Sequence, residues 1–133
     1  MPTEIQYLLS AVGLYLVMIV MQAVSATVSR KASVSDLVGA RDDLPATGLT
    51  PFHGRTKRAQ ANMTEGMVMF VPLVLAAAYL DAFTPLTALG AAMFFYGRLA
   101  FAPLYYLGTP WLRTIAWFVS IIGILLILWE LVL

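Results

Sequence analysis

The chain contains no cysteine among its 133 residues. Disulfides, thiolate metal ligands and a cysteine nucleophile are therefore excluded, and any thiol chemistry would need a thiol brought by another molecule. The chain also has a single histidine, His53, which lies in a stretch rich in proline and glycine without other metal-ligand residues beside it. This context predicts a solvated loop histidine and no metal site.

Charged residues are scarce as well. Only 11% of the residues are charged and 61% are hydrophobic, whereas soluble domains carry about 25% charged and about 45–50% apolar residues. A single domain of this length cannot hide so much apolar surface in its own core, so a lipid bilayer must solvate the excess. The net charge of +1 argues against a nucleic-acid partner. Composition therefore predicts an integral membrane protein.

Four long apolar segments account for most of the chain. The predicted helices cover about 3–29, 58–80, 82–107 and 109–133, and crossing the hydrocarbon core of a bilayer takes about 20 helical residues. A cleaved signal peptide is the alternative for the first segment, because Val24 and Ala26 resemble a cleavage site. The segment is longer than a typical signal core, however, and Glu4 precedes it without any basic residue. A retained helix is the favoured interpretation.

The connections between the segments differ in length. Asp81 is the only charged residue between the second and third segments, and Gly108 lies between the third and the fourth. Both connections are therefore predicted to be tight turns. The connection 30–57 is long and contains several prolines and glycines, which predicts a loop rather than another helix. One long and two short connections predict an all-α, four-helix up-down bundle that forms a single domain over residues 1–133.

The long connection also carries most of the basic residues. It holds Arg30, Lys31, Arg41, Arg55 and Lys57 against Asp36, Asp42 and Asp43. The positive-inside rule places such a loop in the cytoplasm and both termini on the opposite side of the membrane. We therefore expect a multi-pass membrane protein with its basic first loop in the cytoplasm.

Polar side chains nevertheless enter the apolar segments. Arg58, Asn62 and Glu65 are spaced i, i+4, i+7 and share one face near the cytoplasmic end of the second segment. Arg98 lies inside the third segment and Arg113 at the start of the fourth. Charges at membrane depth pair with one another or line polar cavities. One interpretation is a structural ion-pair network, in which Glu65 meets an arginine. The other is a pocket for a carboxylate-rich ligand, because three arginines outnumber one carboxylate.

The stretch from Arg58 to Glu65, RAQANMTE, carries a family resemblance. It resembles the R-A-x-x-N-x-x-E signature of the MAPEG family, the membrane-associated proteins in eicosanoid and glutathione metabolism. The chain looks like a bacterial-type member, which implies the inner (cell) membrane of a bacterium. Four predicted spans, a basic first loop, Arg98, Tyr105 and the pair Leu112-Arg113 support the resemblance. Together these features cover nearly the whole chain.

The resemblance implies a homotrimer that binds glutathione between subunits near the cytoplasmic face. The glutathione-binding residues that it implies are Arg30, Arg58, Gln60, Asn62, Glu65, Arg98 and Tyr105. Arg113 matches the arginine that stabilises the glutathione thiolate, since a guanidinium favours the charged form of a thiol whose pKa is ordinarily about 8.5. The implied function is a glutathione-dependent transferase or peroxidase that acts on lipophilic electrophiles or hydroperoxides, without a metal.

Two positions depart from the family pattern. Gly66 stands where glutathione-binding members commonly have an aromatic residue, and Phe101 stands where a tyrosine is frequent. An alternative function therefore stays open: a non-catalytic structural or accessory membrane subunit that keeps the bundle and its polar network.

Overall fold

The described part of the chain folds into five helices joined by turns. The computed structural model describes residues 1–28, 33–40, 42 and 50–133. The helices are α1 (Thr3–Val28), α2 (Val34–Val38), α3 (Pro51–Tyr79), α4 (Pro85–Tyr106) and α5 (Pro110–Val132). All but α2 are long and apolar enough to cross a membrane. The protein is therefore an integral, multi-pass membrane protein.

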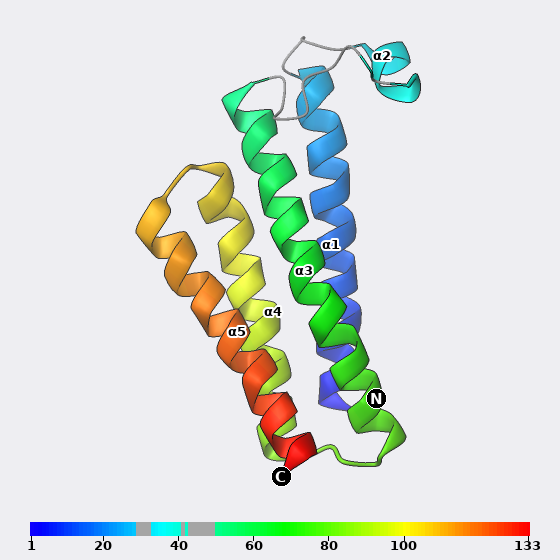
Figure 1. Ribbon diagram of the computed structural model, residues 1–133, viewed down its shortest axis with the longest axis vertical. Helices are drawn as coiled ribbons and strands as arrows, with labels where there is room; N and C mark the ends of the chain where they lie inside the picture. Colours follow the sequence, from blue (N-terminus) through cyan, green and yellow to red (C-terminus); the bar gives the residue numbers. More distant parts are fainter. Residues whose placement is uncertain (29–32, 41, 43–49) are drawn as a thin grey trace.

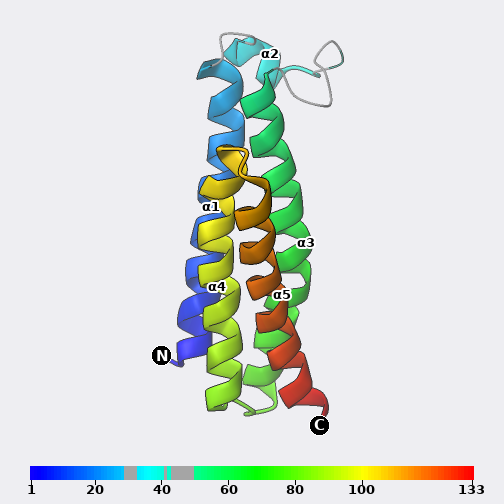
Figure 2. The same cartoon turned by 90° about the vertical axis from the view of Figure 1, so that its left-hand side faces the viewer.

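The four long helices run alternately up and down (Figure 1). Both termini and the α3–α4 turn lie at one end of the bundle, whereas α2 lies at the other end (Figures 1 and 2). This arrangement confirms the predicted four-helix up-down bundle. At the α2 end, α1 and α3 extend beyond the α4–α5 turn, so the bundle ends in a step (Figure 1).

The beginning of α3 differs from the prediction. The helix starts at Pro51 and not near Arg58. Thr50 caps it, because its hydroxyl accepts a hydrogen bond from the backbone N–H of His53 at 3.1 Å. Proline in the first helical turn costs no hydrogen bond, and Gly54 is accommodated inside the helix. The prolines and glycines that predicted a loop here were therefore misread, since they stand at a helix start.

The prediction of a loop without a helix was also wrong at α2. This short helix is held by a capping box, in which the Ser33 hydroxyl accepts from the Asp36 backbone and the Asp36 carboxylate accepts from the Ser33 N–H at 2.9 Å. The Asp36 carboxylate accepts hydrogen bonds from the Ser33 backbone N–H and from the Ser33 hydroxyl, and both hold the pKa of Asp36 below its usual range. The connection thus contains local helical structure outside the membrane-spanning segments.

Helices α4 and α5 pack with their backbones in close contact. A Cβ atom added to Gly90 would lie 2.6 Å from the carbonyl oxygen of Gly123, and one added to Gly97 would lie 2.8 Å from that of Ala116. Small residues allow such close approach between helices in a membrane. The hairpin that carries Tyr105 and Arg113 is therefore a firmly packed unit.

Polar side chains join α1 to α3. The hydrogen-bonded pairs are Tyr15 with Thr64 at 2.6 Å, Gln22 with His53 at 3.1 Å, and Ser25 with Thr56 at 3.0 Å. His53 is only 4% exposed, so the expectation of a solvated loop histidine was wrong. It is buried because α3 begins two residues before it and turns its ring toward α1.

A buried carboxylate joins α1 to α4 near the termini. Glu4 is 4% exposed and accepts a hydrogen bond from the hydroxyl of Thr87 at 2.5 Å. On α3 and α4, the stacked rings of Phe70 and Phe94 lie 4.0 Å apart between centroids in the core. These contacts fix the helix that carries Asn62 against the hairpin.

Candidate functional site

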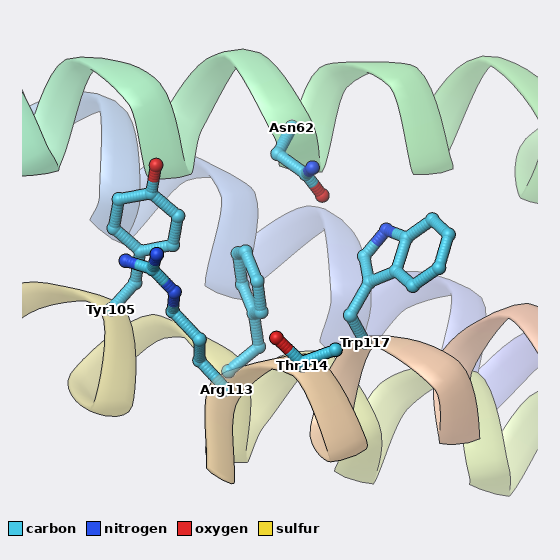
Figure 3. A pocket seen from close by; sticks show the side chains of 6 residues that line it. Asn62, Tyr105, Arg113, Thr114 and Trp117 are labelled. Carbon is cyan, nitrogen blue, oxygen red and sulfur yellow. The ribbon is translucent and has the colours of Figure 1, made fainter. Parts of the chain in front are cut away.

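Three of the predicted site residues line one cavity between α3 and the α4–α5 hairpin. The cavity has a volume of about 250 Å³ and is lined by Asn62 from α3, Phe101 and Tyr105 from α4, and Arg113, Thr114 and Trp117 from α5 (Figure 3). The segments that meet here are far apart in the sequence. Their convergence depends on the antiparallel packing of α3 against the hairpin.

Arg113 lies against the ring of Tyr105. The guanidinium carbon is 4.5 Å from the ring centroid, in a cation–π contact that Figure 3 shows at the edge of the cavity. The Tyr105 ring is supported in turn by Phe101, at 5.3 Å between centroids. Arg113 makes no hydrogen bond within the described part of the chain, so its N–H donors are available to a ligand. The arrangement holds a positive charge at the rim of a largely apolar cavity.

Arg98 forms the buried polar centre behind this cavity. It is 1% exposed, and its Nη1 donates a hydrogen bond to the side-chain oxygen of Asn62 at 2.5 Å. The guanidinium also lies 5.2 Å from the ring centroid of Phe101. The ion pair between Glu65 and an arginine, which one of the two interpretations required, does not form among the described residues. Glu65 is exposed and interacts with Arg98 only electrostatically.

Gly66 provides the space that Arg98 occupies. A Cβ atom at this position would lie 2.8 Å from Nη2 of Arg98, 3.2 Å from its Cζ, and 3.2 Å from a ring carbon of Phe94. A larger side chain at position 66 would therefore overlap with the Arg98 guanidinium, which explains why this chain has glycine where the family pattern commonly has an aromatic residue.

The other predicted residues do not line this cavity. Arg58 and Glu65 are exposed on α3. Gln60 faces a different cavity of about 280 Å³, lined by Gln22, Lys57, Gln60 and Ala61. Arg30 lies outside the described residues. The structure therefore brings Asn62, Arg98, Tyr105 and Arg113 together and separates Gln60 from them.

Trp117 at the cavity and Arg55 at the α4–α5 turn were not among the predicted site residues. Trp117 follows Arg113 by four residues on α5, a spacing that puts both side chains on one face of the helix. This spacing could have identified Trp117 from the sequence. Arg55 donates a hydrogen bond to the carbonyl oxygen of Tyr106 at 3.4 Å, and its guanidinium lies beside Gly108. It precedes Asn62 by seven residues, a helical spacing that was hidden because the helix was expected to start later.

Comparison with known proteins gives one match. The family model for the MAPEG family matches residues 7–133. Searches of the curated proteins and of the solved structures found no match. The family match covers nearly the whole chain and agrees with four helices able to cross a membrane. The chain therefore belongs to the MAPEG family.

Proposed function

We propose that the protein is a membrane enzyme that uses glutathione to modify lipophilic electrophiles or to reduce lipophilic hydroperoxides. MAPEG membership supports a glutathione-linked role in general. The observation that carries the specific proposal is the convergence of Arg113, Tyr105 and Asn62 on one open cavity. The chain has no cysteine, so glutathione supplies the nucleophile.

Arg113 is the residue proposed to activate the thiol. A guanidinium close to the sulfur lowers the pKa of the glutathione thiol from its ordinary value of about 8.5, so more of it is thiolate at neutral pH. The cation–π contact with Tyr105 keeps the guanidinium at the cavity rim. The thiolate then attacks the electrophile, and its sulfur forms the new bond as the leaving group departs.

The exposed face of α3 is proposed to hold the tripeptide. Arg58 offers a fork of donors that suits a carboxylate, and Glu65 offers an acceptor for the glutathione amine. Both side chains are exposed on the same helix face as Asn62, so a ligand that enters the cavity would extend along them.

A second copy of the chain is proposed to complete the site. The cavity of about 250 Å³ is smaller than the roughly 300–1,000 Å³ of most small-molecule sites. Gln60 faces away from Asn62, so a ligand held by both would need walls from more than one subunit. A homotrimer, as is typical of the family, meets this requirement. Native mass spectrometry that shows only monomers or dimers would contradict it.

Glutathione binding to detergent-purified protein tests the function directly. We expect saturable binding and an ultraviolet absorbance of bound thiolate at neutral pH, together with turnover of a lipophilic electrophile. Far-ultraviolet circular dichroism controls for folding. Folded protein that shows neither binding nor thiolate absorbance at millimolar glutathione would overturn the proposal. The hydrogen bond between Arg98 and Asn62 would then support the structural or accessory role.

A further inference from the structure

The orientation of the Asn62 amide follows from its contact with Arg98. An arginine side chain only donates hydrogen bonds, so the Asn62 atom that faces it must be the oxygen. The amide nitrogen is then the remaining polar atom of the side chain, and it has no hydrogen-bond partner among the described residues. Gly66 makes this orientation possible, because it leaves room for Arg98. Asn62 therefore offers its N–H donors to a ligand, whereas its oxygen already accepts from Arg98.

Trp117 adds a second donor at the same cavity. Its indole nitrogen faces Asn62 across the cavity (Figure 3), and an indole N–H can only donate. Within the described part of the chain it has no hydrogen-bond partner. The neighbouring Thr114 does not compete for this role, because its hydroxyl donates to the backbone oxygen of Pro110 at 2.8 Å. Among the described residues that line the cavity, the donors that remain free belong to Asn62, Tyr105, Arg113 and Trp117.

None of the described residues that line the cavity is a carboxylate. A site with several donors and no anionic acceptor is complementary to an oxygen atom that carries or develops negative charge. Arg113, whose guanidinium lies against Tyr105, is assigned together with that tyrosine to the thiolate side of the cavity. This leaves Trp117 and Asn62 for the second substrate. A halide leaving group would gain less from this pair, because the transition-state charge develops on a large, weakly accepting atom.

We propose that Trp117 determines specificity by donating, together with Asn62, a hydrogen bond to an oxygen of the second substrate. The inference rests on the proposed function and names its substrate class: electrophiles whose charge develops on oxygen, represented by α,β-unsaturated ketones. The glutathione sulfur bonds to the β-carbon, and the π electrons of the double bond move to the carbonyl oxygen. The resulting enolate oxygen accepts from Trp117 and Asn62, and the α-carbon then takes a proton from water. Thiol and ketone are thus consumed one for one.

The test compares two substrates on the intact protein in detergent with saturating glutathione. The first is trans-4-phenyl-3-buten-2-one, an unsaturated ketone, and the second is benzyl chloride, which has no oxygen. Trp117→Phe removes the donor and keeps an aromatic ring. We expect kcat/KM for the ketone to fall about 10-fold or more, whereas kcat/KM for benzyl chloride changes less than about 2-fold. Trp111→Phe is the matched control, because Trp111 is on the same helix and 80% exposed; both rates should stay unchanged.

The outcomes separate this inference from the proposed function. Equal losses with both substrates, or no loss with either, would show that Trp117 only packs, and would overturn the inference while leaving the function intact. A wild-type protein that turns over neither substrate overturns the function and the inference together. If Trp117→Phe does not fold, Trp117→His and Trp117→Leu provide a second pair. The histidine variant keeps a ring N–H and should retain more of the preference for the ketone than the leucine variant.

Discussion

A guanidinium inside a membrane protein must replace the hydrogen bonds that water would provide. Arg98 has one hydrogen bond to Asn62 and lies near the rings of Phe94 and Phe101. Its Nε atom is buried without a partner among the described residues. The charge is therefore held by packing as much as by hydrogen bonds, and the missing side chain at Gly66 is part of that packing.

Gly66→Ala should destabilise the protein by about 1–3 kcal/mol, because the new methyl group would overlap with the Arg98 guanidinium. The added Cβ atom would lie 2.8 Å from Nη2 of Arg98. Thermal unfolding in detergent, followed by circular dichroism, measures the change. Gly13→Ala is the control, since a Cβ atom there meets nothing within 4 Å. A Gly66→Ala variant as stable as the control would show that Arg98 can move aside without cost.

Arg113→Ala should retain most glutathione binding and lose the thiolate absorbance at neutral pH. Without the guanidinium, the thiol pKa returns toward about 8.5, so the absorbance reappears only as the pH rises toward that value. Arg113→Lys should recover part of the signal, because an ammonium is a point charge without the planar fork. The measurement is the pH dependence of thiolate absorbance at saturating glutathione. An unchanged titration in Arg113→Ala would assign thiolate stabilisation to another residue.

At the scale of the element, the spans could be predicted and their ends could not. Hydropathy reports which residues contact lipid, so the four long helices were visible in the sequence. The start of α3 depends on one cap, the hydroxyl of Thr50, and a threonine before a proline has no hydropathy signature. Because the helix start was predicted too late, Arg55 was assigned to a loop. It lies in the first turns of α3 and contacts the α4–α5 turn.

Some residues of the candidate site could likewise be predicted from the sequence, and others could not. Asn62 was found through a contiguous motif, because RAQANMTE lies within one helix. Trp117 belongs to no such motif, and its place beside Asn62 results from tertiary packing across α3 and α5. The contact between Arg98 and Asn62 could not be read from the sequence for a related reason. Charge complementarity made Glu65 one possible partner of an arginine, but that carboxylate is exposed, and the Asn62 amide meets the guanidinium.

Thr50→Ala should loosen the first turns of α3. Loss of an N-cap typically costs about 1 kcal/mol, and the effect should concentrate in residues 51–57 as faster amide hydrogen exchange. Thr109→Ala is a close control, because Thr109 precedes α5 in the same position without a side-chain cap hydrogen bond. If both variants exchange alike, the hydroxyl of Thr50 does not hold the start of the helix.

At the scale of the whole molecule, orientation in the membrane is the open prediction. The basic residues of the connection 30–57 predict that this end faces the cytoplasm. Both termini lie at the opposite end of the bundle (Figure 1). Because the chain has no cysteine, a single introduced cysteine reports its own side of the membrane without background.

Ala40→Cys and Thr3→Cys place thiols at the two ends, at exposed positions. In intact cells, a membrane-impermeant maleimide should label the cysteine at position 3, and should label the one at position 40 only after permeabilisation. Labelling is read by a mass shift on denaturing gels. The reverse pattern would invert the topology and contradict the positive-inside assignment.

The step at the α2 end of the bundle has a consequence for how two reagents of opposite solubility meet. Tyr105 and Arg113 lie next to the short α4–α5 turn, and α1 and α3 continue beyond it (Figure 1). In the proposed orientation, a peptide dissolved in the cytosol approaches along the projecting part of α3, and an oil-soluble molecule arrives sideways from the bilayer. Under the proposed function, the protein would act as a phase-transfer catalyst, in which neither reagent has to leave its own solvent before the reaction.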